Sequence, residues 1–123
     1  MTTTDKATRP ITHEMLVEAG ACEQQLTEFG LRFGRSVVPT HELAVECADK
    51  FDWRWAANRL LSIDGTREYN KRANEAFDRY MTAASRATKI DDQKMAWVEL
   101  RRAWVELRRA GAFIFVRLWI EGK

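Results

Sequence analysis

The sequence lacks the short motifs that mark common catalytic sites. It contains no P-loop, no GxGxxG fingerprint, no GxSxG nucleophile elbow and no HExxH zinc motif. Only two histidines are present, and both fall where helices are expected to begin, so they offer little for general base chemistry. Asp49, Asp52 and Asp64 are not spaced as a calcium or magnesium loop requires. We therefore expect no enzymatic activity, no catalytic residue, no metal site and no cofactor.

Cysteine and proline are scarce, with two of each among 123 residues. There is no CxxC pair and no histidine at zinc-finger spacing, which argues against a zinc site. Cys22 and Cys47 lie beside apolar neighbours in segments expected to be helical, so we predict two buried, reduced thiols of a cytoplasmic protein. The segment from Thr66 to Ala110 contains neither glycine nor proline, which permits long helices there.

Long apolar runs are missing as well. The longest, Ala112–Ile120, is interrupted by Arg117 and falls well short of the roughly 20 residues that span a bilayer. The first residues hold no apolar run of the kind that a secretory signal needs. We expect a soluble, cytoplasmic protein with no membrane partner. The net charge is only +2, and the mildly basic second half lacks the dense basic stripe of a dedicated nucleic-acid binder.

The apolar residues that are present recur at spacings of three and four, the period of amphipathic helices. This pattern predicts an all-α fold, a compact helical bundle of about five to six helices, with short N-terminal helices and two longer C-terminal helices. Residues 1–9 are polar and aperiodic and are expected to form a flexible tail. Residues 10–123 are expected to form a single helical domain.

Capping residues and turn signals predict the helix boundaries. Thr12, Thr40 and Asp52 are suitable N-caps for short helices, and the residues before Pro39 should be extended.

Asp64–Gly65 is a turn signal. A break at 88–92, with Asp91 or Asp92 as the next N-cap, should separate the two long helices. Whether the last helix continues to its end is left open, because Phe113–Val116 also has the composition of a strand.

Two segments share one pattern: Thr12-His-Glu-Met-Leu-Val-Glu-Ala19 resembles Thr40-His-Glu-Leu-Ala-Val-Glu-Cys47. One interpretation is a pair of helices with the same good start. The other is a metal site, since each segment holds two glutamates four residues apart beside a histidine. Di-metal helical bundles place the histidine three residues after the glutamate, whereas here it precedes the glutamate and points to another face. Helix capping is therefore the prediction.

A second repeat is identical in both copies: Ala96-Trp-Val-Glu-Leu-Arg-Arg102 recurs as Ala103-Trp-Val-Glu-Leu-Arg-Arg109. Seven residues are nearly two whole helical turns, so in a helix each side chain keeps its face apart from about 20° of drift. In a β-strand, where side chains alternate between two faces, inserting seven residues would move the apolar side chains to the opposite face. The repeat therefore predicts a continuous helix.

The repeat also aligns two indoles with guanidinium groups four residues later, where an arginine could cover a tryptophan ring. One interpretation is an ordinary bundle helix with buried tryptophans, which helical aromatic stripes favour. The other is a ridge that binds a partner protein, because tryptophan and arginine are enriched at interface hot spots. Glu99 and Glu106 lie among the arginines and argue against direct binding of nucleic acid. The candidate partner-binding residues are Trp97, Arg101, Arg102, Trp104, Arg108 and Arg109.

An alternative function is that of a structural module whose last helix forms a homodimer. The residues of that possible oligomer interface are Phe113, Phe115, Val116, Trp119 and Ile120.

Three segments carry a resemblance to a known group: Ile11-Thr-His-Glu-Met-Leu16, Ala21-Cys-Glu-Gln-Gln-Leu26 and, above all, Ala48-Asp-Lys-Phe-Asp-Trp-Arg-Trp-Ala-Ala-Asn-Arg-Leu-Leu61. The chain resembles small phage and bacterial helical proteins of unknown function that share an Asp-Trp-x-Trp-Ala-Ala module. The likeness covers residue 11 to about residue 84, and the tandem repeat departs from it. The group offers no catalytic residues to carry over.

The resemblance implies a mobile-element setting. Small phage accessory proteins often inhibit a host defence complex by binding it stoichiometrically, as anti-CRISPR proteins do. The expected partner is thus a host protein or a ribonucleoprotein complex.

Overall fold

Six α-helices and one short β-ladder make up the computed structural model, which describes residues 9–123. In chain order the elements are β1 (Ile11–Thr12), α2 (His13–Glu18), α3 (Glu23–Phe33), β2 (Ser36–Val37), α4 (His41–Glu46), α5 (Trp53–Leu60), α6 (Ile63–Ala87) and α7 (Gln93–Ile120). The predicted all-α fold with two long C-terminal helices is confirmed.

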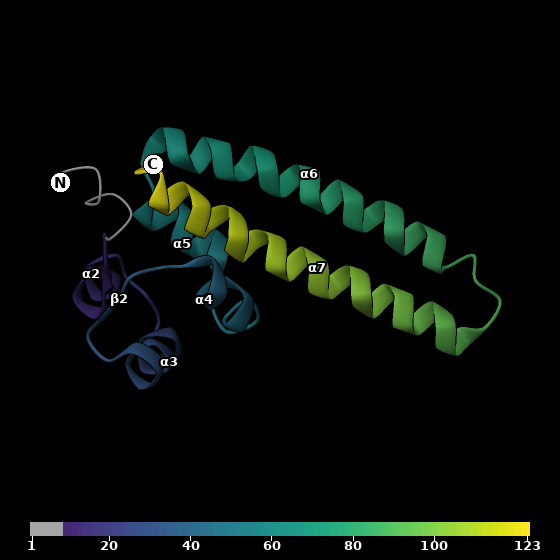
Figure 1. Ribbon diagram of the computed structural model, residues 1–123, viewed down its shortest axis with the longest axis horizontal. Helices are drawn as coiled ribbons and strands as arrows, with labels where there is room; N and C mark the ends of the chain where they lie inside the picture. Colours follow the sequence, from purple (N-terminus) through teal and green to yellow (C-terminus); the bar gives the residue numbers. More distant parts are fainter. Residues whose placement is uncertain (1–8) are drawn as a thin grey trace.

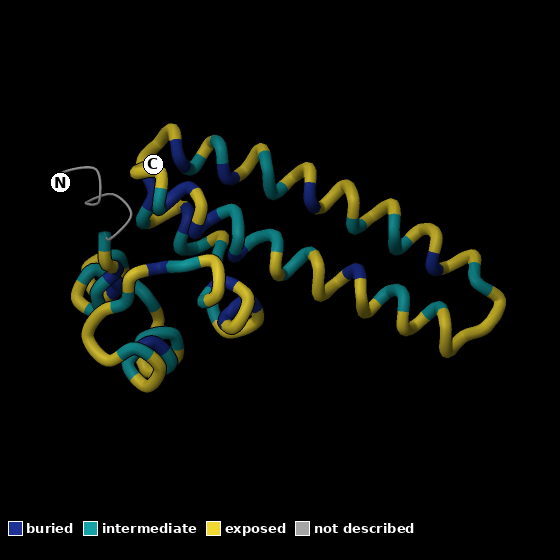
Figure 2. Tube along the Cα trace, in the orientation of Figure 1, coloured by how far each residue is buried: buried dark blue, intermediate teal, exposed yellow. Residues whose placement is uncertain are grey.

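The two long helices form an antiparallel hairpin, and the short elements gather at one end of it (Figure 1). α6 runs away from that end and α7 returns to it, so the connection at residues 88–92 is the far tip. We call residues 73–109 the arm and the other described residues the head. In Figure 2 the buried positions gather in the head, whereas those of the arm are isolated points along the two helices.

The N-caps predicted at Thr12, Thr40 and Asp52 are confirmed. Each side-chain oxygen accepts the backbone N–H three residues later, at 3.0, 3.2 and 3.0 Å. Asp92 caps α7 in the same way and accepts from two backbone N–H groups at 2.9 and 3.3 Å. Capping is local chemistry, which is why these positions could be found from the sequence.

The turn predicted at Asp64–Gly65 is wrong, because both residues lie in the first turn of α6. Ser62 supplies the cap there and accepts the N–H of Gly65 at 3.0 Å. Gly65 does not form a turn; its lack of a side chain lets the end of the described chain come close to α6. A Cβ at this position would lie 2.4 Å from the carbonyl oxygen of Lys123, which accepts the N–H of Ser62 at 2.6 Å.

The segment before Pro39 is extended, as predicted, and forms β2. It pairs in antiparallel fashion with β1, with Ile11 opposite Val37 and Thr12 opposite Ser36. The ladder ties the start of the described chain to the segment between α3 and α4.

The centre of the core lies in the last third of α7. Phe115, Val116 and Leu118 are the largest fully buried side chains of the described residues. This segment is helical without interruption from the tandem repeat onward, so a strand at Phe113–Val116 does not form. Helix is favoured because the segment packs against α4, α5 and α6 from several sides.

This burial corrects the predicted oligomer interface. Phe115 is 1% exposed, Val116 1% and Trp119 2%, so all three already pack inside their own chain. They offer no surface to a second subunit. Phe113 and Ile120 are half-buried against the same core, and the ring of Phe113 lies 5.9 Å from the ring of His41.

The tail predicted at residues 1–9 lies outside the described residues except for Arg9, which is ordered. Its guanidinium carbon lies 3.5 Å from the centre of the Trp119 ring, and its Nη2 donates to the carbonyl oxygen of Trp119 at 2.8 Å. The indole Nε1 of Trp119 donates in return to the carbonyl oxygen of Arg9 at 2.8 Å. This reciprocal contact joins the start of the described chain to the end of α7.

The two cysteines are free and differ in exposure. Cys47 is buried, as predicted, and its burial raises the pKa of the thiol. Cys22 is exposed, so its predicted burial is wrong. It occupies the N-cap position of α3 instead of the interior of a helix. Among the described residues no helix combines the length and apolarity that a membrane crossing needs.

Candidate partner-binding face on the arm

The tandem repeat lies within α7, which is continuous through both copies. Alternating steps of four and three residues place one row of its side chains against α6: Ala96, Leu100, Ala103, Leu107 and Ala110. Of these, Ala103 is buried, and on α6 Ala76 and Ala87 are buried likewise. The arm is thus held by a narrow seam made largely of alanine.

The tryptophans of the repeat lie beside this seam and not in it. Trp97 is 66% exposed and Trp104 is 49% exposed, so the interpretation that places them in the core is wrong. Each follows a seam alanine by one residue, which turns it about 100° around the helix. Figure 1 shows that α6 is the one described element beside α7 away from the head, which agrees with the exposure of both indoles.

Aromatic rings from both helices meet on this side of the arm. The ring of Trp104 lies 5.9 Å from that of Tyr80, edge to face, and Tyr80 lies 6.0 Å from Phe77. Such pairs add about 0.5–1.5 kcal/mol beyond area burial. Phe77 and Met81 are about half exposed. We call the set the aromatic face; its members are Phe77, Tyr80, Met81, Trp97 and Trp104.

The four arginines of the repeat divide into two pairs. Arg101 and Arg108 each follow a tryptophan by four residues and lie about 40° around the helix from it, whereas Arg102 and Arg109 lie about 140° away. Arg102 pairs with Glu99 at 3.4 Å. Within residues 9–123, neither Arg101 nor Arg108 forms an ion pair. Of the six candidate residues, four therefore share the aromatic face and two do not.

The expected stacking of arginine on the two exposed indoles is not found. In the described part of the chain the cation–π contact lies in the head, where Arg9 covers Trp119. The guanidinium groups of Arg101 and Arg108 consequently leave the faces of Trp97 and Trp104 uncovered.

On α6, the row of side chains next to the seam on the aromatic face carries no charge. Helical spacing places an uncharged row beside the seam: Asn70, Asn74, Phe77, Met81 and Ala84. Glu68 and Arg72 lie on the other side of the seam, where they pair at 2.9 Å. Asp78 lies at the outer edge of the uncharged row, four residues after Asn74 and three before Met81. The sequence pattern contained this asymmetry, but it becomes visible only once the seam is known.

A cleft of about 380 Å³ opens where the arm joins the head. Phe77 and Arg108 line it, so it continues the aromatic face. Its other lining residues are Phe51, Asp52, Trp53, Arg54, Tyr69, Ala73, Ala76, Leu107 and Gly111. The Tyr69 hydroxyl lies 3.2 Å from the place where a Cβ on Gly111 would be, so this glycine makes room for it.

Burial raises the pKa of Tyr69 to about 12. The nearby charge of Arg54 opposes this shift and that of Asp52 adds to it. The hydroxyl is therefore protonated at neutral pH and can donate a hydrogen bond. No residue of this cleft other than Arg108 was among the sequence candidates, because the cleft joins residues from three helices.

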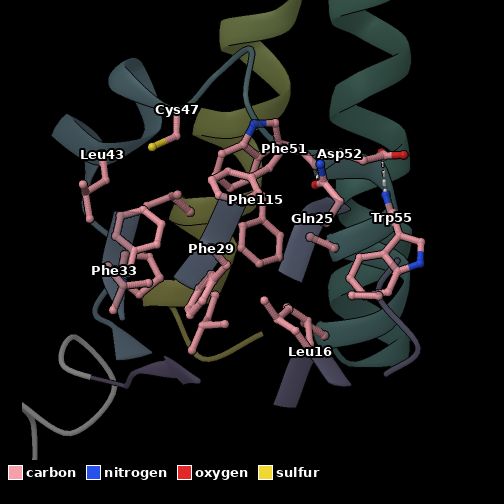
Figure 3. A pocket seen from close by; sticks show the side chains of 18 residues that line it. Leu16, Gln25, Phe29, Phe33, Leu43, Cys47, Phe51, Asp52, Trp55 and Phe115 are labelled. Atoms are coloured by element: carbon pink, nitrogen blue, oxygen red, sulfur yellow. Dashed lines mark hydrogen bonds between the residues drawn. The ribbon is translucent and has the colours of Figure 1, made fainter. Parts of the chain in front are cut away.

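A second hollow, of about 80 Å³, lies within the head (Figure 3). Its walls are mainly apolar, with Leu16 and Phe29 on one side and Phe115 of α7 behind them. The polar groups at its edge are already engaged. Gln25 accepts the backbone N–H of Asp52 at 3.2 Å, and Asp52 caps α5. The hollow is a small gap between short helices and brings no reactive groups together.

The two segments of the histidine–glutamate repeat form the beginnings of α2 and α4. Both of its threonines are caps. His13 lies 6.2 Å from the ring of Phe29, and His41 packs near an aromatic ring of α7. Within the described range, no three side chains of histidine, cysteine, aspartate or glutamate come together as metal ligands.

Comparison with protein-family models, with curated proteins and with solved structures gave no match. The resemblance to small phage and bacterial proteins stays a prediction from the sequence.

Proposed function

We propose that this chain is a small binding protein that uses the aromatic face of its arm, together with Arg101 and Arg108, to occupy a surface of a partner protein. The observation that carries the proposal is the exposure of Trp97 and Trp104 on an arm that projects from the core. Large exposed apolar patches mark interaction sites. The proposal assigns the chain no catalytic step.

The resemblance to phage proteins suggests the setting. We propose that the partner is a host protein or a ribonucleoprotein complex of bacterial defence, and that binding inhibits it stoichiometrically. The arm supports this proposal because it presents its aromatic side chains on two helices that are already formed and paired. Little ordering entropy is then lost on binding, which favours a tight complex.

Tryptophan substitution tests this role. The double variant Trp97→Ala/Trp104→Ala removes both indoles. Since truncating a hot-spot residue costs about 2 kcal/mol or more, we expect affinity for the partner to fall at least thirtyfold. Affinity purification of the tagged chain from a bacterial host, followed by mass spectrometry, measures which complex is recovered and how much.

The tandem repeat supplies a matched control. Val98 and Val105 follow the two tryptophans by one residue and are also exposed, but they face away from the seam. The variant Val98→Ala/Val105→Ala should recover the partner as the unchanged chain does. Recovery of no host protein even at low salt, or equal recovery with and without the indoles, would contradict the proposal.

A further inference from the structure

The uncovered side of the arm carries exposed apolar side chains at helical spacing and arginines without an ion pair in the described part of the chain, which suits it to a third helix. We propose that the partner presents an acidic amphipathic α-helix, which lies along the groove between α6 and α7 on the aromatic face. This inference rests on the proposed function and specifies the chemistry of the partner element.

The spacing of the apolar groups favours a helix as the occupant. Trp97 and Trp104 are seven residues apart, as are Phe77 and Ala84 on α6. A stripe that repeats every two turns on both helices matches the seven-residue repeat of a third helix packed alongside. From Trp97 to Arg108 the stripe is about 17 Å long at 1.5 Å per residue, or three turns of a partner helix.

The charge of this side favours an acidic helix. The α6 row beside the seam is uncharged, and α7 contributes Arg101 and Arg108, which form no ion pair within the described residues. The carboxylates of Asp78 and Asp52 lie at the margins of this side. Arg108 is also half-buried at the cleft. A charge in partly apolar surroundings interacts more strongly with an opposite charge than it would in open water. Carboxylates along the rim of a partner helix would pair with both arginines.

The same charges disfavour a second copy of this chain. Two aromatic faces brought together would place four arginines against surfaces whose carboxylates, Asp52 and Asp78, lie only at the margin. Like charges across an interface cost several kcal/mol. Two arginines are also few for a nucleic-acid backbone, whose binding depends on many phosphate contacts. The aromatic rings could nevertheless stack on bases, so single-stranded DNA belongs in the test.

Two labelled peptides of about three heptads test the inference. They share one apolar stripe of leucine and alanine and differ only in flanking positions, all glutamate in one and all lysine in the other. Fluorescence anisotropy with the full chain measures their affinities. We expect the glutamate peptide to bind at least about tenfold more tightly than the lysine peptide.

The repeat again provides matched variants. Arg101→Glu/Arg108→Glu should reverse the order of the two peptides. Arg102→Glu/Arg109→Glu makes the same change of charge in the same two heptads, but about 140° away from the tryptophans. It should leave the order unchanged and each affinity within about threefold.

Three outcomes would overturn the inference: absence of binding by the glutamate peptide, equal effects of the two arginine pairs, or tighter binding of an oligothymidylate than of the glutamate peptide. Failure of the proposed function looks different, because recovery of the host partner would then be independent of Trp97 and Trp104. If recovery of the host partner depends on the tryptophans but the two peptides bind equally well, only the proposal of an acidic helix is rejected.

Discussion

Helix α7 carries three tryptophans, and the two regions of the molecule treat them differently. Trp119, in the head, is 2% exposed, whereas Trp104 and Trp97, in the arm, are 49% and 66% exposed. Trp119 has Phe115 stacked at 6.0 Å and Arg9 on its ring. Trp104 has the edge contact with Tyr80. The same residue type on the same helix is thus core or surface according to how many elements surround it.

The comparison shows what the arm lacks. In the head, α7 is covered by α4, α5 and α6. Along the arm, beyond the cleft in which Leu107 and Arg108 meet the head, its neighbour is α6 (Figure 1). Complete burial of a large apolar side chain is worth about 1.5–3 kcal/mol, and the two indoles, 66% and 49% exposed, forgo part of that. The arm carries two such indoles, one in each copy of the repeat. A third element that covered them would add the free energy of their burial, which is the physical basis of the proposed binding role.

The largest expected effect separates the two regions by stability. Trp119→Ala should lower the free energy of unfolding by about 3–5 kcal/mol, because it leaves a cavity in the head. Trp104→Ala should lower it by about 1 kcal/mol or less, since the indole is half in water and loses mainly its edge contact. Urea denaturation followed by far-UV circular dichroism measures both.

Trp97→Ala is the control, with an expected change within about 0.5 kcal/mol. If Trp104→Ala proved as costly as Trp119→Ala, the arm would have a core of its own and the distinction between the regions would fail.

Local features of both regions could be predicted from the sequence. The caps at Thr12, Thr40, Asp52 and Asp92 depend only on the side chain and the next three backbone N–H groups. The continuous helix through the tandem repeat follows from its length of seven residues. These conclusions needed no knowledge of tertiary contacts.

Contacts between distant segments could not be predicted. The pair Asp64–Gly65 is typical of a turn, but Gly65 in fact makes room for Lys123, which is far away in the sequence. The apolar run near Phe115 suggested a subunit interface, because periodicity cannot tell which chain covers a residue. Likewise, helical spacing put Trp97 and Trp104 beside apolar neighbours without revealing that the arm has only two helices.

The junction of the two regions should respond to alkaline pH. The pKa of Tyr69 is raised to about 12 by burial, so folding favours the protonated hydroxyl. The resulting stability is fully present below the unfolded pKa of about 10 and is lost as pH rises to about 12. We expect the free energy of unfolding to fall by about 2–3 kcal/mol across this range, measured by urea denaturation at several pH values.

Tyr69→Phe should remove that part of the alkaline loss, because phenylalanine has no hydroxyl to ionise. Tyr80→Phe on the arm leaves Tyr69 in place and should keep the loss. Equal pH dependence in the two variants would show that the Tyr69 hydroxyl does not titrate at the junction as its burial requires.

The smallest expected effect concerns two helix caps, one at the tip of the arm and one in the head. Asp92→Ala removes the cap of α7 at the tip of the arm and should cost about 1 kcal/mol, as should Asp52→Ala in the head. Because the tip is held only by the narrow seam with α6, it can open without the head. Hydrogen exchange measured by mass spectrometry should therefore quicken near residues 93–96 in Asp92→Ala and leave the head unchanged.

In Asp52→Ala the loss of protection against exchange should spread over the head, since α5 packs into the common core. A quickening of the whole molecule by Asp92→Ala would mean that arm and head open as one cooperative unit.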